Sequence, residues 1–282
     1  MNPDQYIGHS ATSAWHGQLH HLLYRGEQNA SPRGAKTQEV LHSTIHLDSR
    51  LCVLKNPVRK LSYRFMAAEA YWIMSGSDKV AEIAPYNTRI HEFSDNGVDY
   101  FGAYGPKVVA QKDYVVRKLL EDRDTRQAGL TIWRENPPQT KDVPCTVAMF
   151  FQLRNSFLHC QVFMRSSDIW LGLPYDMFNF SMIMHGICAE MNNGLDYTAT
   201  FGRIAVPGVL SITMASSHLY DQNRAAADEC VKFAQSFENR PDSRLTPADY
   251  FMYADGSWAS TVEMLKHLRE TKPGDPERWW EQ

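Results

Sequence analysis

The chain has 282 residues, of which 43% are hydrophobic, 12% aromatic and 22% charged. This composition is typical of a globular protein with a sizeable core, and it excludes a collagen-like or extensively disordered chain. The 29 Lys and Arg residues against 32 Asp and Glu residues give a net charge of -3. We therefore do not expect the protein to bind a nucleic-acid polymer electrostatically.

The sequence also bears on location and on the number of domains. The N-terminus lacks the basic start and apolar middle of a signal peptide, and no apolar stretch is long enough to span a bilayer. We expect a cytoplasmic protein, in the host cytoplasm if a phage encodes it, with no membrane partner. The five cysteines show no CxxC spacing, which argues against a disulfide framework and against a structural metal site. No repeat or linker divides the chain, so we predict one domain over residues 1–282.

The first predicted elements are helical. Apolar residues at helical spacing predict a helix over residues 12–24, followed by a polar loop over 28–34. Residues 62–75 are rich in helix formers and apolar nearly all round, which predicts a buried helix with Glu69 in its middle. A carboxylate is costly to bury unless it is paired or protonated, so Glu69 is a candidate for proton transfer.

Strands follow in the middle of the chain. A short apolar run over residues 128–133 predicts one strand, and runs over 145–153 and 157–165 predict a hairpin. After Gly172-Leu173-Pro174, apolar residues at helical spacing predict a core-facing helix that begins near Asp176. Strands and helices are mixed without regular βαβ alternation, so we predict an α+β fold.

Cys145 and Arg165 are candidates for nucleophilic chemistry. Cys145 follows Pro144 at the start of a predicted strand, although a free cysteine is more often a small buried hydrophobe. A nucleophilic role requires nearby cations that favour the thiolate. Arg165, in the next strand of the hairpin, can supply one.

The segment RSSDIWLGLPYD, residues 165–176, combines an arginine, hydroxyls, two carboxylates and a glycine turn. An arginine and a serine together suit a phosphate, because both donate to its oxygens. The alternatives are a surface salt bridge and, for Asp176, a helix N-cap. His218 and Tyr220 in SSHLY can bond a sugar hydroxyl, or they can lie in a surface hairpin. Other histidine pairs lack the acidic or thiol neighbours of a metal site, so we predict no metal.

In this order, these residues resemble the thymidylate synthase superfamily over residues 32–221. The most specific part is Pro144-Cys145 followed by RSSDIWLGLPYD, which resembles the family pattern RS-x-D-x-x-LG-x-P-[FY]-N. The resemblance implies a thymidylate synthase-like fold, in which helices back a large mixed sheet, and a homodimer built on the sheet face.

The resemblance also implies roles for individual residues. Carbon 5 of a pyrimidine is a poor nucleophile until a thiolate adds to carbon 6, and Cys145 would supply that thiolate. Glu69 would be the acid and base, and Asp176 would contact the base. The implied nucleotide-binding residues are Arg33, Arg126 (across the dimer interface), Arg165, Ser166, Asp168, Asp176, His218 and Tyr220. The implied folate-side residues are Glu69, His91, Tyr104, Asp168 and Gly172, and the implied cofactor is 5,10-methylenetetrahydrofolate.

Departures from the family pattern bear on substrate and product. Asp176 stands where the pattern has Asn; a carboxyl group accepts from the 4-amino group of cytosine and shares a proton with ring nitrogen 3. In this respect the chain resembles the phage deoxycytidylate hydroxymethylases. Thr146 and Gln127 replace a His and an Arg, and His91 or Ile90 stands in place of a covering Trp. The end of the sequence, PERWWEQ, lacks the family's apolar tail. An open site favours water addition.

These features predict a folate-dependent deoxycytidylate (dCMP) 5-hydroxymethylase. One alternative is a methyltransferase acting on the same nucleotide, and a second is a hydroxymethylase acting on CMP. A third alternative, from another functional class, is a non-catalytic nucleotide- or RNA-binding relative.

Overall fold

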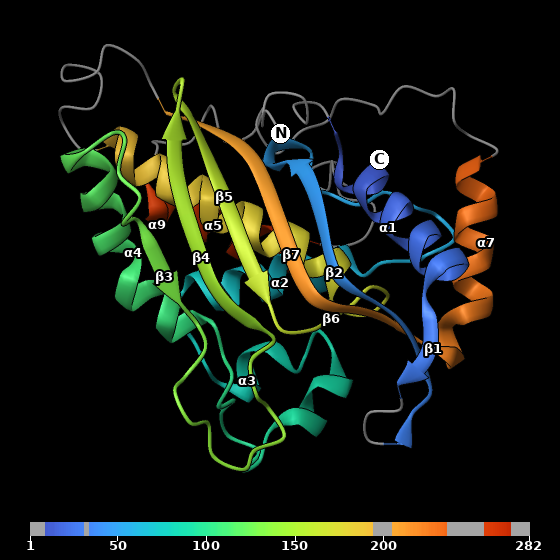
Figure 1. Cartoon of the computed structure of the whole chain (residues 1–282). Helices are drawn as coiled ribbons and strands as arrows, with labels where there is room; N and C mark the ends of the chain where they lie inside the picture. The colour runs from blue at the N-terminus through green and yellow to red at the C-terminus, as the bar shows by residue number, and fades with distance from the viewer. Residues whose placement is uncertain (1–8, 31–33, 194–204, 236–256, 272–282) are drawn as a thin grey trace.

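A mixed sheet forms one layer of the molecule (Figure 1). The computed structural model describes residues 9–30, 34–193, 205–235 and 257–271. Within them the strand order is β1-β2-β7-β5-β4-β3, with β6 beside β7. The strands are β1 Glu27–Ala30, β2 Thr37–Asp48, β3 Gly129–Thr131, β4 Thr146–Arg154, β5 Phe157–Met164, β6 Ser167–Asp168 and β7 Val206–Tyr220. The β5–β7 and β6–β7 pairs are parallel and the others antiparallel, which confirms a mixed sheet and an α+β architecture.

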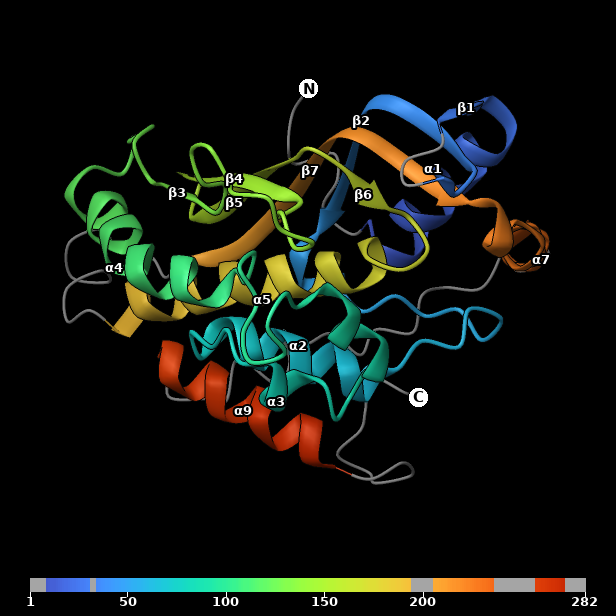
Figure 2. The ribbon, with the colours of Figure 1, turned by 90° about the horizontal axis from the view of Figure 1, so that it is seen from below.

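Helices cover one face of this sheet in two tiers (Figure 2). α5 and α4 lie nearest to the strands, and α2 and α9 lie beyond them, while α1 and α7 lie near the β1–β2 edge. The helices are α1 Ala11–Arg25, α2 Tyr63–Met74, α3 Val80–Ile83, α4 Gly105–Glu121, α5 Leu173–Asn193, α7 Arg224–Gln235 and α9 Trp258–Glu270. None of the described helices is long and apolar enough to cross a membrane.

Local sequence signals explain the predicted helices. α1 begins after Ser10, whose side chain accepts a hydrogen bond from the backbone N–H of Ser13. α2 begins after Ser62, whose side chain accepts from the N–H of Phe65, and it ends at Ser75. Both helices lie where the apolar spacing predicts them. The predicted loop over 28–34 is wrong in its first part, because Glu27–Ala30 pairs with β2 as β1; residues 31–33 lie outside the described residues.

The predicted hairpin is confirmed as β4 and β5. Asn155 and Ser156 connect the strands with φ angles of 50° and 69°, the left-handed conformation that matches the twist of a two-residue hairpin. The predicted strand over 128–133 is β3, and the helix predicted after Pro174 is α5.

The long strands β2 and β7 form the centre of the sheet and are absent from the sequence prediction. Eleven register pairs join them, from Thr37↔Tyr220 to Asp48↔Val209. His218 and Tyr220 therefore belong to the end of a central strand, and a surface hairpin is the wrong interpretation. Because β6 pairs with β7 through Asp168↔His218, this strand end lies directly beside the conspicuous 165–176 segment.

Helix α5 approaches α9 closely at a glycine. A Cβ atom added at Gly186 would lie 2.6 Å from a ring carbon of Trp258 and 2.7 Å from the methyl carbon of Met74. The indole of Trp258 is fixed there, because its N–H donates to the carbonyl of Met74 at 3.0 Å. Gly186 therefore sets how closely α2, α5 and α9 pack.

Two glycine-to-alanine variants test this contact. Gly186→Ala should lower the free energy of unfolding by about 1–3 kcal/mol, because the added methyl group overpacks a fixed ring. Gly17→Ala in α1, where a Cβ meets no atom within 4 Å, should raise it by up to about 1 kcal/mol, since alanine is the better helix former. Urea denaturation measures both. If Gly186→Ala instead stabilised the protein, the contact of Gly186 with Trp258 and Met74 would not be as tightly packed as described.

Candidate active site

Cys145 and Arg165 meet where the β4–β5 hairpin opens. Cys145 directly precedes β4 and Arg165 directly follows β5. The N–H of Arg165 donates to the carbonyl of Cys145 at 2.8 Å. The Arg165 guanidinium donates through Nε to the carbonyl of Pro144 at 3.0 Å and through Nη2 to that of Val143 at 2.7 Å. Arg165 thus holds the segment that carries the thiol.

The environment of Cys145 decides how readily it ionises. Cys145 is partly exposed, whereas the other four cysteines are buried. Burial raises the pKa of the Cys145 thiol, Arg165 opposes this rise, and Asp176, Asp142 and Asp168 add to it. The predicted cation is therefore present, but burial and the carboxylates outweigh it. The free site holds the thiol largely protonated.

Tyr104 and Thr146 form a second support beside the thiol. Tyr104 precedes α4, and its phenol oxygen accepts hydrogen bonds from the backbone N–H of Thr146 at 3.2 Å and from its hydroxyl at 3.0 Å. Burial, then Asp176 and Cys145, raise the pKa of Tyr104 well above its usual value. Tyr104 is therefore a neutral phenol, and the two donors from Thr146 leave its own proton free to point elsewhere.

Asp176 lies in the first turn of α5, where its N–H donates to the carbonyl of Gly172 at 3.0 Å. Its carboxyl group is partly buried and accepts no hydrogen bond from the described residues. The helix-cap interpretation of Asp176 is therefore wrong. Burial raises the pKa of Asp176 well above its usual value, and Glu69 and Asp168 raise it further. A neutral carboxyl group without a partner is available to a ligand.

Glu69 points from the middle of α2 toward α5. Its Oε2 accepts a hydrogen bond from Nδ2 of Asn179 at 2.8 Å. Burial raises the pKa of Glu69 to about 7, although the bond from Asn179 opposes the rise. A carboxyl group with this pKa exchanges its proton near neutrality, as the candidate proton-transfer role of Glu69 requires.

Asp168 and His218 lie side by side on β6 and β7. Oδ1 of Asp168 accepts from the N–H groups of Trp170 at 2.8 Å and Leu171 at 2.9 Å. Nδ1 of His218 lies 3.3 Å from the hydroxyl of Ser166. The rings of His218 and Tyr220 meet edge to face at 5.4 Å. Burial lowers the pKa of His218, and the carboxyl group of Asp168 opposes this. Through these contacts the side chains form one polar cluster.

The remaining predicted site residues are Gly172, His91, Arg126 and Arg33. Gly172 lines the site at Asp176, since a Cβ there would lie 3.4 Å from Oδ2 of that residue. His91 lies on the 3₁₀ helix Thr88–Phe93 with an exposed side chain, and Arg126 is exposed before β3. Arg33 lies outside the described residues.

Sequence reasoning missed Asn179 and Arg59. Asn179 is an amide in a stretch of large apolar residues, and that contrast was an available signal. The guanidinium of Arg59 lies 4.4 Å from the centre of the Trp170 ring and donates to the Trp170 carbonyl at 2.5 Å. No local pattern predicts that contact, because 111 residues separate the partners.

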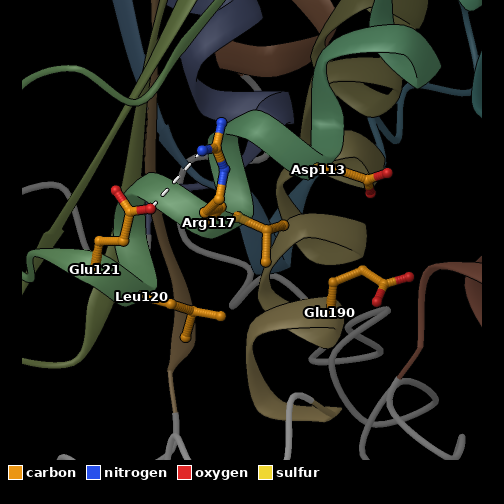
Figure 3. A pocket seen from close by; sticks show the side chains of 6 residues that line it. Asp113, Arg117, Leu120, Glu121 and Glu190 are labelled. Atoms are coloured by element: carbon orange, nitrogen blue, oxygen red, sulfur yellow. Dashed lines mark ion pairs between the residues drawn. The ribbon is translucent and has the colours of Figure 1, made fainter.

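A separate surface hollow lies between α4 and the far end of α5 (Figure 3). It has a volume of about 380 Å³ and is lined by Asp113, Val116, Arg117, Leu120, Glu121 and Glu190. It contains none of the predicted site residues. In the described part of the chain, no three His, Cys, Asp or Glu residues are placed to hold a metal ion.

The charges around Cys145 predict its alkylation behaviour. Arg165→Gln should raise the pH midpoint of Cys145 alkylation, and Asp176→Asn should lower it, because a cation favours the thiolate and a carboxylate opposes it. Iodoacetamide labelling as a function of pH measures both shifts. Cys145→Ser is the control and should remain unlabelled, since the other cysteines are buried. Shifts of the same sign in both variants would refute this electrostatic account.

Comparison with known proteins identifies the family of the chain. The thymidylate synthase family model matches residues 13–251. The deoxyuridylate hydroxymethyltransferase of Bacillus phage SP01 is 28% identical over 212 residues, which cover 64% of this chain and 53% of that protein. The chain thus spans about half the length of this curated relative. Because the family model matches most of the sequence, the chain belongs to the thymidylate synthase family.

Proposed function

We propose that the chain is a folate-dependent deoxycytidylate 5-hydroxymethylase. The observation that carries this proposal is Asp176, a partly buried carboxyl group that lacks a hydrogen-bond partner among the described residues and whose pKa is raised by burial. It is close enough to Cys145 to raise the pKa of the thiol. One ring bound between them can meet both groups.

The hydrogen-bonding groups of cytosine match this carboxyl group, which is why we propose cytosine as the ring. The protonated carboxyl group donates to ring nitrogen 3, and its carbonyl oxygen accepts from the 4-amino group. Transfer of the proton to nitrogen 3 makes carbon 6 more electrophilic toward the Cys145 thiolate. The SP01 relative is named for deoxyuridylate. Under this proposal, the two proteins therefore differ in the base of the nucleotide on which they act. Its name also supports the hydroxymethyl product.

The reaction uses the other residues as follows. Cys145 adds to carbon 6, and Arg165 holds its segment in place. Bound 5,10-methylenetetrahydrofolate supplies the one-carbon unit. Glu69, with a pKa of about 7, accepts and returns protons near neutral pH. Ser166, His218 and Tyr220 hold the sugar, and Arg165 with Arg33 holds the phosphate.

The site residues fit a pterin on the Asp168 side. Oδ1 of Asp168 is taken by two backbone N–H groups, while Oδ2 has no donor among the described residues. A carboxylate with one oxygen free can accept hydrogen bonds from the adjacent N–H donors of a pterin ring. Leu171, beside it, has 46% of its surface exposed and offers an apolar contact. Gly172 leaves room near Asp176, and Tyr104 and His91 complete the proposed folate side.

A homodimer is part of the proposal. The sheet face that no described helix covers carries Phe150 and Phe163, which are 37% and 41% exposed and contact each other edge to face. Hydrogen bonds Thr44–Thr213 and Gln161–Thr213 join side chains of β2, β7 and β5. Paired exposed aromatics on a sheet face favour burial against a second copy. The exposed Arg126 would reach the neighbouring site.

Product analysis tests the proposed function. With methylenetetrahydrofolate, the protein should convert dCMP to the 5-hydroxymethyl nucleotide without stoichiometric dihydrofolate, and it should act less well on CMP and dUMP. Mass spectrometry and dihydrofolate absorbance measure both. A methyl product with dihydrofolate formation would establish the methyltransferase, and a preference for CMP would establish the ribonucleotide enzyme. Absence of carbon 5 hydrogen exchange, with Cys145→Ser as the negative control, would favour a non-catalytic binding protein.

A substitution at Asp176 tests the preference for cytosine over uracil. Asp176→Asn should shift preference from dCMP toward dUMP, because an amide donates to the 4-oxo group and accepts from the N–H of uracil. A mispaired buried polar group costs about 1–3 kcal/mol, so the ratio of the two kcat/KM values should move roughly tenfold to a hundredfold. An unchanged ratio would remove Asp176 from base recognition.

A further inference from the structure

Asn179 is a buried amide whose nitrogen donates a hydrogen bond and whose oxygen accepts none from the described residues. It is 2% exposed, and its Nδ2 donates to Oε2 of Glu69 at 2.8 Å. Its Oδ1 is buried and has no donor among the described residues. Such an oxygen costs about 1–3 kcal/mol if nothing bonds to it. It therefore points to a bound donor that completes the site.

The position of Asn179 identifies where that donor lies. Asn179 follows Asp176 by three residues in α5, so both side chains project from the same face of the helix. Asp176 is the proposed contact to the base, and Glu69 faces Asn179 from α2. The flanking residues Phe178 and Phe180 are buried and apolar. Asn179 thus lies between the Glu69 carboxyl group and the end of the helix that carries Asp176.

We propose that Asn179 Oδ1 and the free oxygen of Glu69 hold one water molecule, and that Asn179 is the positioning residue that directs this water to the exocyclic carbon. The inference rests on the proposed function. Both oxygens are acceptors, so the water donates both of its hydrogens to them. Its lone pairs then face away from the two oxygens, toward the substrate.

The hydration step balances with these groups. The water oxygen forms a bond to the exocyclic methylene carbon, and one water proton passes to the Glu69 carboxylate. The electron pair of the exocyclic double bond moves into the ring. The Cys145 thiolate then leaves carbon 6, which restores the ring double bond between carbons 5 and 6. Asn179 keeps its amide orientation throughout, because Nδ2 remains bonded to Glu69.

Competition with an added thiol tests the role of Asn179. An exogenous thiol such as 2-mercaptoethanol competes with water for the exocyclic carbon and gives a thioether nucleotide. Asn179→Leu, of similar size but without polar atoms, should raise the ratio of thioether to hydroxymethyl product by about tenfold or more. Ser181→Ala is the matched control. Ser181 lies on the same helix, and its hydroxyl bonds with the carbonyl of Met177 and with the thiol of Cys52. Neither partner belongs to the proposed site, so the ratio should stay unchanged.

The possible results separate the two proposals. A fall in total turnover with an unchanged product ratio would show that Asn179 is only structural and would overturn the inference. Absence of hydroxymethyl product from the unmodified protein would instead defeat the proposed function. If Asn179→Leu does not fold, a high-resolution crystal structure of the unmodified protein decides. A water bonded to both Asn179 Oδ1 and Glu69 supports the inference, and direct contact of the two side chains through both oxygens contradicts it.

Discussion

Three carboxyl groups share a partly buried site with a thiol that must ionise, and this crowding governs the chemistry of the molecule. Glu69, Asp168 and Asp176 do not all readily carry a charge in such surroundings, because burial favours the neutral form of each and repulsion from Glu69 and Asp168 adds to this at Asp176. Burial accordingly raises the pKa of each of them. The free site therefore stores protons on carboxyl groups and keeps Cys145 as a thiol.

The fold holds this unfavourable cluster in place through apolar packing. Helix α5 carries Asp176 and Asn179 but is otherwise almost wholly buried between the sheet and the α2–α9 tier. Gly186, at its middle, lets Trp258 lie against the helix. The other side of the cluster is fixed to the sheet by the hydrogen bonds of Arg165 and Thr146. The carboxyl groups have little freedom to separate, so in the free site protonation is what relieves their repulsion.

Some of this organisation could be predicted from the sequence. The predicted helices have strong apolar periodicity and clear end signals, and the β4–β5 hairpin has two apolar runs around a short turn. β2 and β7 were missed because polar residues alternate irregularly along them, as in TQEVLHSTIHLD. Their pairing joins segments about 170 residues apart, which no local signal encodes. Cys145 and Arg165 could be paired from the hairpin register, whereas the contact between Asn179 and Glu69 depends on how α2 packs on α5.

Base choice and nucleophile activation are coupled through Asp176 under the proposed function. A neutral Asp176 can pass its proton to ring nitrogen 3 of cytosine, which leaves a carboxylate beside a cationic ring. Conjugation spreads that ring charge toward carbon 6, where the Cys145 thiolate must approach, and the charge offsets the repulsion that raises the pKa of the thiol. Uracil carries a proton on nitrogen 3 already and offers no basic nitrogen there, so binding uracil would leave the thiol without this compensation. The electrostatic crowding that suppresses Cys145 in the free site thus becomes a source of selectivity for cytosine.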